Sequence, residues 1–315
     1  MAPVTALVCT VDRPALAKSA VQALLRSEGV ELELILMDQS AGDETSRALG
    51  PLLADPRLVY VRTVARGKPH ALNEGLARAR GEVVVCTDDD CQPSRSWVAR
   101  MAEALLSQPG AALAFCRVDP APHDASAGYV PSFAPRSTRL VRTLTELMRE
   151  RGIGAGMALQ RAAVLALGGF DEAVGPGALF PSGDDYDLAV RALLHGYGVF
   201  QTSDVSITHH GFRTFAEGRL HARLNFIGIG AICAKALRVG GWSSLPLTLW
   251  EFGAHALWPP FGDLVRFRRP RGLSRIVGFA QGFVRGLQTR LDRERIRFVP
   301  GAACLQLSDA HGRSQ

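Results

Sequence analysis

The stretch VVVCTDDDCQPS, residues 83–94, places three consecutive aspartates directly after an apolar run. The β-branched residues before them predict a buried strand over residues 82–87. Adjacent carboxylates repel one another, and burying them without partners is costly. Asp88, Asp89 and Asp90 therefore need a cation, a cluster of hydrogen-bond donors or open solvent, and which of these they have bears directly on function.

Similar strands recur through the first part of the chain, and each is followed by a helical pattern. We expect strands over 4–11, 32–38 and 57–63, with helices after Asp12, over 43–49 and over 68–80. Such alternation predicts an α/β fold with a mostly parallel central sheet and helices on both faces. Ligands of these sheets bind beyond the carboxyl ends of the strands, where Asp38 and Asp88–Asp90 fall.

The spacing of Asp88 and Asp90 suggests a metal site. Carboxylate oxygens at a strand end suit Mg²⁺ or Mn²⁺, commonly together with substrate phosphates. The alternatives are a solvated acidic loop or carboxylates that cap the next helix. Because Ser94 can provide that cap, we interpret the aspartates as metal ligands.

A second polar cluster lies further along the chain. Asp184 and Asp185 open a predicted helix, where the helix dipole favours anions. Capping explains one carboxylate, so the other is a candidate to accept a proton from a hydroxyl. His209 and His210 end a strand predicted over 205–210, and since neighbours on a strand point to opposite faces, at most one can face the site.

Lysines are rare, which draws attention to Lys68. Lys68 could meet a phosphate or simply cap a surface turn, and the sequence leaves both open. Cys86 and Cys91 flank the aspartates and are expected to be inert packing residues. The six cysteines form no CxxC pattern and no export signal is evident, which predicts reduced thiols in the cytoplasm.

Positive charge concentrates near the C-terminus. Residues 264–297 contain ten arginines and two acids, so the remainder of this chain of net charge +6 is slightly acidic. Residues 273–291 predict an amphipathic helix with Ile276, Phe283 and Leu287 on one face, and glycines recur every fourth residue, which allows close helix contact. This helix, preceded by three tryptophans, could dock peripherally on the inner face of a membrane or pack on the catalytic domain.

This region is expected neither to span a membrane nor to bind nucleic acid. The most apolar run, residues 243–265, is interrupted by Glu251, His255 and two prolines, so we expect no membrane span. Nucleic acid is not expected as a partner either, because the arginines lack interleaved aromatic residues for base stacking.

The ordered series of motifs resembles the inverting, nucleotide-sugar-dependent glycosyltransferases of family 2, which have the GT-A fold. The resemblance covers residues 4–215. It rests on the opening VTALVCTVDRP…LELILMDQSAGDET, on RGKPHALNEGLARARGEVVVCTDDDCQPSRSW with its DxD motif, and on GAGMALQRAAVLALGGFDEAVGPG and GDDYDLAVRALLHGY. It implies a GT-A domain over 1–215, with a nucleotide-sugar-binding half (1–116) and an acceptor and catalytic-base half (117–215), and a helical Arg-rich extension over 216–315.

The resemblance also implies roles for individual residues. Asp38 would hold the nucleotide base, Asp88 would lie by the ribose and phosphates with Lys68 nearby, and the general base would be Asp185. The divalent metal, Mn²⁺ or Mg²⁺, would bind Asp90 and either His209 or His210. Two departures are Gln39, where a second aspartate is common, and Asp184 in place of the usual glutamate.

The expected activity is sugar transfer from a nucleotide-diphosphate sugar to an acceptor hydroxyl, with inversion. The acceptor could be a glycan, a lipid-linked molecule or a small molecule. One alternative is a sugar nucleotidyltransferase, but TVDRP stands where such enzymes carry a glycine-rich loop. The other is a catalytically silent binding module, against which the intact Asp90 and Asp185 argue.

Overall fold

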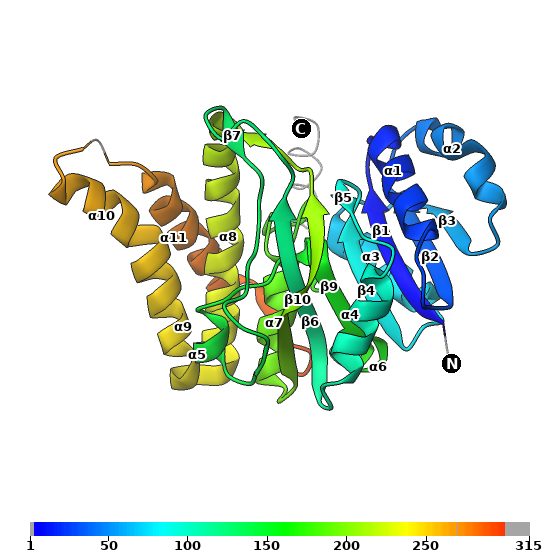
Figure 1. The fold of residues 1–315 in the computed structure, drawn as a ribbon. Helices are drawn as coiled ribbons and strands as arrows, with labels where there is room; N and C mark the ends of the chain where they lie inside the picture. Colours follow the sequence, from blue (N-terminus) through cyan, green and yellow to red (C-terminus); the bar gives the residue numbers. More distant parts are fainter. Residues whose placement is uncertain (1–2, 269, 300–315) are drawn as a thin grey trace.

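The computed structural model describes residues 3–268 and 270–299. Within this range a nine-stranded sheet forms the centre of the protein (Figure 1). Its first half is parallel, as the alternation of strands and helices predicted. This half has the order β3 (Leu58–Arg62), β2 (Leu32–Asp38), β1 (Val4–Thr10) and β4 (Val83–Asp88).

The second half of the sheet is mixed, which refines the sequence prediction. β9 (Met157–Gln160) runs antiparallel to both of its neighbours, β4 and β6 (Ala111–Pro120), and β6 pairs in parallel with β10 (Gly198–His209). The two reversals cancel, so β6 and β10 run in the same direction as β4. Asp38, Asp88 and His209, the last residues of β2, β4 and β10, therefore share one edge of the sheet.

Short elements complete the sheet and the loops around it. β5 (Cys91–Gln92) and β8 (Arg139–Val141) both pair antiparallel with β10. A separate pair joins β7 (Gly128–Tyr129) to β11 (Arg213–Thr214). Gly154–Gly156 form a 3₁₀ turn, η2, directly before β9 begins.

Helices cover both faces of the sheet, as predicted. In Figure 1, α4 lies in front of the strands and α7 lies behind them. α4 buries Trp97, Val98, Met101 and Leu105, whose spacing places them on one helical face. The helices of this part are α1 (Pro14–Leu25), α2 (Glu44–Leu49) with the 3₁₀ turn η1 (Gly50–Ala54), α3 (Lys68–Arg78), α4 (Trp97–Leu106), α5 (Leu144–Leu147), α6 (Arg161–Ala166) and α7 (Asp184–Leu194).

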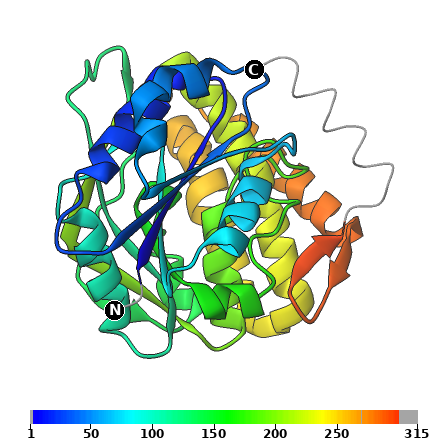
Figure 2. The same cartoon turned by 90° about the vertical axis from the view of Figure 1, so that its right-hand side faces the viewer.

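The C-terminal extension is helical, as expected. α8 (Phe215–Gly240) runs along the end of the sheet, and the chain then reverses at Gly241, whose φ of 56° suits glycine. The elements after α8 are, in chain order, η3 (Gly241–Ser244), α9 (Leu245–Trp250), the π-helical η4 (Glu251–Leu257), α10 (Trp258–Val265), α11 (Leu273–Gln288), β12 (Arg290–Asp292) and β13 (Arg297–Val299). Figure 2 shows the β12–β13 hairpin as orange-red arrows.

One helical stretch, Phe215–Val265, is long and apolar enough to cross a membrane by length and composition. However, 61% of its most apolar window is buried inside the protein. The stretch also folds back on itself at Gly241: α9 returns beside α8, whereas α10 diverges from it, with α11 between the two (Figure 1). The apolar residues in the second half of α8 are used for internal packing, as in a core helix, whereas α10 keeps exposed apolar residues.

α11 packs in parallel against α8 through its glycines. A Cβ atom added at Gly278 would crowd the carbonyl oxygen of Arg223, and one at Gly282 would overlap that of Ile227. The predicted close contact of the glycine face is thus confirmed. Ile276 and Phe283, named in the predicted apolar stripe, pack against a small core that includes Phe226, Ile229 and Phe279.

The extension shares a core with the sheet domain. Ile232 and Ala236 of α8 and Phe298 of β13 belong to the same cluster of buried residues as the strands and α7. The rings of Phe180 and Phe298 lie 4.9 Å apart. The predicted boundary at 215–216 therefore marks a change in secondary structure, and the packing continues across it.

The glycine face generates a stability prediction. Gly282→Ala should destabilise the protein by about 1–3 kcal/mol, because the added methyl group forces α11 away from the backbone of α8. Gly253→Ala is the matched control, since a Cβ at this helical position meets no atom within 4 Å. Thermal unfolding should show a lower Tm for the first variant and an equal or slightly higher Tm for the second. Equal Tm values for the two variants would contradict the tight contact.

Candidate active site

Lys68 and Asp88 form an ion pair at the carboxyl edge of the sheet. The Lys68 Nζ atom lies 2.5 Å from Asp88 Oδ1, and both side chains are about a quarter exposed. Lys68 is the first residue of α3 and follows Gly67, whose φ is 101°. A cation at a helix N-terminus opposes the helix dipole, so the nearby carboxylates are what stabilise it there.

The pKa of Lys68 reflects this balance. Burial acts to lower the pKa, but the charges of Asp88 and Asp184 outweigh it and raise the pKa well above its usual value. Lys68 is therefore a firmly charged cation that faces the edge where Asp38 and Asp88 end their strands. Contact between Lys68 and a substrate phosphate stays a prediction.

Asp185 is held in place by backbone donors at the start of α7. Its Oδ2 atom accepts a hydrogen bond from the Gly154 amide (2.6 Å), and its Oδ1 atom accepts one from the Tyr186 amide (2.7 Å). η2 supplies the first of these donors. The same glycine lies close to Lys68 Nζ, because a Cβ added at Gly154 would be 3.8 Å from that atom and 3.4 Å from Asp185 Oδ2.

The two carboxyl groups that begin α7 have raised pKa values. Burial is the main cause for Asp184, and the charge of Asp185 adds to it although Lys68 opposes it, so the pKa of Asp184 rises to about 7. Burial likewise raises the pKa of Asp185, against the effects of Lys68 and the two backbone donors. Carboxylates with raised pKa values in a cleft are suited to proton transfer near neutral pH.

Asp90 faces His209 across the same edge. The His209 Nε2 atom lies 3.2 Å from Asp90 Oδ1, and His209 Nδ1 contacts the Pro131 carbonyl oxygen at 2.8 Å. The second contact fixes the ring, as outer partners do for histidines that bind metals. His210 differs: its amide bonds the Asp90 carbonyl oxygen, and the residue is exposed. The structure thus brings His209, and not His210, beside Asp90, and binding of a metal by His209 stays a prediction.

The Asp90 cluster has the donor set that a divalent cation requires. Asp90, Cys91 and His209 are the one group of three potential ligands that lie within 4.8 Å of each other in the described part of the chain. The buried Asp90 Oδ1 atom accepts no well-aligned hydrogen bond, although the His209 imidazole approaches it at 3.2 Å, and a bound cation would satisfy this oxygen. Burial raises the pKa of the Cys91 thiol, so a hard metal would use the carboxylate and the imidazole rather than this thiol.

Arg13 is a site residue that the sequence analysis missed. Its Nη1 atom donates to Asp89 Oδ1 (3.0 Å) and to Asp90 Oδ2 (3.2 Å), and Asp89 also accepts a 2.6 Å bond from the Thr10 hydroxyl. Both carboxylate oxygens of Asp89 therefore accept hydrogen bonds from side chains of the protein. Arg13 lies in the turn that follows the end of β1 at Thr10, so its place near the carboxyl edge was the available signal.

Asp38 lies at the predicted edge but is fully buried. Its Oδ2 atom accepts a 2.7 Å bond from the Tyr60 hydroxyl, and its Oδ1 atom accepts one from the Ser40 amide at 2.9 Å. Both oxygens are thus engaged inside the protein, and contact between Asp38 and a nucleotide base stays a prediction. The thiols near the aspartates are inert as expected, since burial raises the pKa of Cys86 to about 12.

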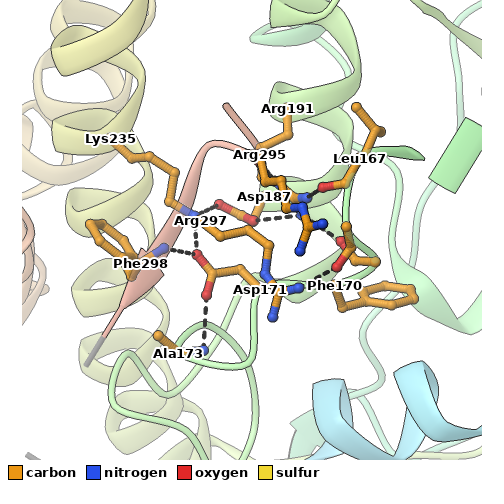
Figure 3. Close-up of polar contacts among 12 residues, drawn as sticks. Leu167, Phe170, Asp171, Ala173, Asp187, Arg191, Lys235, Arg295, Arg297 and Phe298 are labelled. Atoms are coloured by element: carbon orange, nitrogen blue, oxygen red, sulfur yellow. Dashed lines mark hydrogen bonds and ion pairs between the residues drawn. The ribbon is translucent and has the colours of Figure 1, made fainter. Parts of the chain in front are cut away.

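A buried charge cluster fixes the helix that carries Asp184 and Asp185 (Figure 3). Lys235 of α8 bonds Asp187 of α7 at 2.6 Å and Asp171 at 2.5 Å, and all three are fully buried. The Phe298 amide of β13 also donates to Asp171 (2.8 Å). Arg191 of α7 donates to the carbonyl oxygens of Leu167 and Gly169, in the turn after α6, and to that of Arg295 in the β12–β13 hairpin.

Comparison with known families identifies the chain. Residues 5–165 match the family described as Glycosyl transferase family 2. The chain belongs to this family. It is accordingly an enzyme of the nucleotide-sugar glycosyltransferase type, which confirms the family and the enzyme class expected from the motifs. No curated protein matches the chain.

Solved structures share the GT-A-like fold. The mannosyltransferase PcManGT from Pyrobaculum calidifontis, in complex with GDP-Man and Mn²⁺, is 21% identical with a TM-score of 0.61, covering all of this chain and 81% of that one. TarS 1–349 from S. aureus with UDP-GlcNAc is 14% identical (TM-score 0.62; 90% and 81% covered). Glucosyl-3-phosphoglycerate synthase from Mycobacterium tuberculosis is 19% identical (TM-score 0.50; 75% and 78% covered). At these identities the similarity establishes the fold alone.

The raised pKa of Asp184 predicts a pH-dependent effect on stability. A carboxyl group whose pKa rises from 3.8 to about 7 on folding binds its proton more tightly in the folded state, so stability falls as pH increases through this interval. Asp184→Asn removes that loss. The Tm of the variant minus that of the wild type should therefore be larger at pH 8 than at pH 5, measured without metal or nucleotide.

Glu31→Gln is the control for this experiment, because it removes one carboxylate from an exposed position. Its Tm difference from the wild type should be small and nearly the same at both pH values. A difference for Asp184→Asn that does not change with pH would show that the folded protein does not raise this pKa.

Proposed function

We propose that this family 2 glycosyltransferase transfers a sugar from a nucleotide-diphosphate sugar to an acceptor hydroxyl with inversion, using Asp185 as general base. The observation that carries the proposal is the fixed Asp185 carboxylate with its raised pKa. Across the same edge lies a separate set of groups suited to a diphosphate. Two functions, proton acceptance and charge neutralisation, are thus assigned to two carboxylate sets.

Asp185 is suited to activate an acceptor hydroxyl. Its two backbone hydrogen bonds hold the carboxylate in one orientation and leave lone pairs free. As the acceptor oxygen forms its bond to the anomeric carbon, its proton passes to Asp185, and the bond from that carbon to the diphosphate breaks on the opposite side. Direct displacement of this kind inverts the anomeric centre and needs no covalent enzyme intermediate.

Cations of the site suit the leaving diphosphate. Asp90 and His209 would hold Mn²⁺ or Mg²⁺, which supplies positive charge to the diphosphate oxygens when bound. Lys68 stays charged beside Asp88, and Arg13 presents a half-exposed guanidinium between Asp89 and Asp90. Both side chains can contribute hydrogen bonds to phosphate oxygens.

Recognition of the nucleotide is proposed at the end of β2. Asp38 would contact the base only if the Tyr60 hydroxyl moved away from it. The neighbouring Gln39 is partly exposed and donates to the carbonyl oxygens of Ala65 and Gly67. Gln39 is thus the more accessible of the two, and it stands where a second aspartate is common.

The remaining alternatives fit the geometry less well. A catalytically silent module would not require the Asp90–His209 pair or a carboxyl group with a raised pKa at Asp185. A sugar nucleotidyltransferase is disfavoured because the turn after β1 reads TVDRP, where such enzymes carry a glycine-rich loop. The described cysteines are all free thiols, and we propose a cytoplasmic location for the enzyme. We propose that its acceptor is a glycan, a lipid-linked molecule or a small molecule.

The first test separates the base from donor binding. Asp185→Asn keeps the shape of the side chain but cannot accept a proton, so turnover should fall by about 10²–10⁴. The affinity for the donor, measured by calorimetry, should stay within a few-fold of the wild type. A large loss of donor affinity with nearly normal turnover would move Asp185 to the donor site.

The second test concerns the metal and uses nucleotide binding rather than activity. A nucleoside diphosphate at 100 times its Kd should stabilise the wild type by about 2.7 kcal/mol, and we expect this gain only when Mn²⁺ is present. Asp90→Ala and His209→Ala should abolish the Mn²⁺ dependence. His210→Ala is the matched control and should keep it. Equal Mn²⁺ dependence in all three variants would exclude the proposed ligands.

A further inference from the structure

We infer that the outer face of α10, together with the turn that follows it, docks this protein on an anionic membrane surface. Leu257, Trp258, Phe261, Leu264 and Val265 recur at spacings of three and four residues and are all exposed, and we call them the α10 outer face. The opposite side of the helix buries Ala256, Pro260 and Asp263. The helix is therefore amphipathic, with its apolar side turned away from the protein.

The turn after α10 extends this apolar surface. Phe267 is 100% exposed and has a positive φ of 54°, which is uncommon for a bulky residue. Trp258, at 64% exposed, packs against Phe261 in a tilted arrangement with ring centroids 5.8 Å apart. Exposing an aromatic ring to water is less favourable than burying it in an apolar environment. Tryptophan is enriched at membrane–water interfaces.

The charges around this surface are of one sign. Glu251 and Asp263 are the two acids of residues 241–275; Glu251 is buried in an ion pair with Arg151, and Asp263 pairs with the exposed Arg271. Arg266 and Arg268 flank Phe267 and are exposed. The exposed charges described beside the α10 outer face are therefore basic, which complements anionic lipid headgroups.

The same charges disfavour a second copy of this chain as the occupant. In a two-fold dimer a surface patch meets itself, so Arg266 and Arg268 would face the same arginines with no exposed acid nearby. Like charges brought together in this way repel. A bilayer offers apolar depth for Trp258 and Phe261 and negative charge for the arginines at once.

The docking face lies at the end of the molecule where the candidate active site opens. Gly278 packs on Arg223, Gly282 on Ile227 and Gly286 on Ala231, so α11 runs parallel to α8 in constant register. This register places the start of α11, and the turn before it, beside the first turns of α8. α8 begins shortly after His209 at the carboxyl edge of the sheet (Figure 1). Docking would therefore hold the site close to the bilayer.

This inference differs from the docking predicted from the sequence. The sequence prediction placed the apolar stripe on α11 at Ile276, Phe283 and Leu287. In the structure, the glycine face of α11 and Phe279 pack against α8. Arg271 is likewise engaged with Asp263 and is not free for lipid. Leu287 stays exposed on α11 together with Val277 and Val284, but the exposed aromatic residues Trp258, Phe261 and Phe267 lie on α10 and the turn after it, and docking is assigned to these.

The test is co-sedimentation of the full chain with vesicles of phosphatidylcholine alone and of phosphatidylcholine with 30% phosphatidylglycerol. We expect binding to the anionic vesicles only, weakening steeply with added salt. Arg266→Ser with Arg268→Ser should reduce partitioning roughly 30-fold, as expected for two basic residues near an anionic surface. Trp258→Ser with Phe261→Ser should also abolish binding, with an unchanged Tm because both side chains are exposed.

Leu106→Ser and Arg95→Ser change comparably exposed residues elsewhere and serve as controls, which should bind vesicles like the wild type. Mn²⁺-dependent nucleotide binding should be the same in all these variants, so a failure of docking is distinguishable from a failure of the proposed sugar transfer. Equal binding to neutral vesicles, or no binding to anionic ones, would overturn the inference. Concentration-dependent self-association lost in the Trp258/Phe261 variant would assign the α10 outer face to a second copy and overturn it as well.

Discussion

The salt bridges of Lys235 with Asp171 and Asp187 are the interaction on which the rest of the structure depends. They are fully buried, and removing one partner of such a cluster leaves an uncompensated charge, which is strongly destabilising. The three residues come from α8, from the loop after α6 and from α7. One side chain of the C-terminal extension therefore sets the position of the helix that begins with Asp184 and Asp185.

The site itself is a concentration of carboxylates at one edge of the sheet. Asp88, Asp90, Asp184 and Asp185 converge there because β4 and α7 both direct their relevant ends to that edge. Arg13 and Lys68 offset part of the negative charge, while burial, assisted by the neighbouring carboxylates, raises the pKa values of Asp184 and Asp185. This imbalance is what suits the edge to a divalent cation and a diphosphate.

The sequence predicted the part of the site that follows from local rules. Strand periodicity and the position of acids at strand ends were sufficient to place Asp88 and Asp90, since the carboxyl ends of parallel strands meet at one edge. Asp185 was placed at the start of a helix by the pair of acids that precedes an apolar helical pattern. Long-range features were not accessible. The antiparallel β9, the choice of His209 over His210 and the role of Lys235 depend on pairings between segments far apart in the chain, which neither periodicity nor composition encodes. Arg13 was missed because a lone arginine after a strand is ordinary.

The glycine face of α11 has a consequence for how the chain can change in evolution. Three glycines, each opposite a residue of α8 that lies 55 positions earlier, tie the two helices in a fixed register. One inserted or deleted residue inside either helix would rotate the following turns by about 100° and turn the glycines away from their partners. We therefore expect relatives that keep this contact to place their length differences in the turns at 241–244 and 266–272, leaving the lengths of α8 and α11 unchanged.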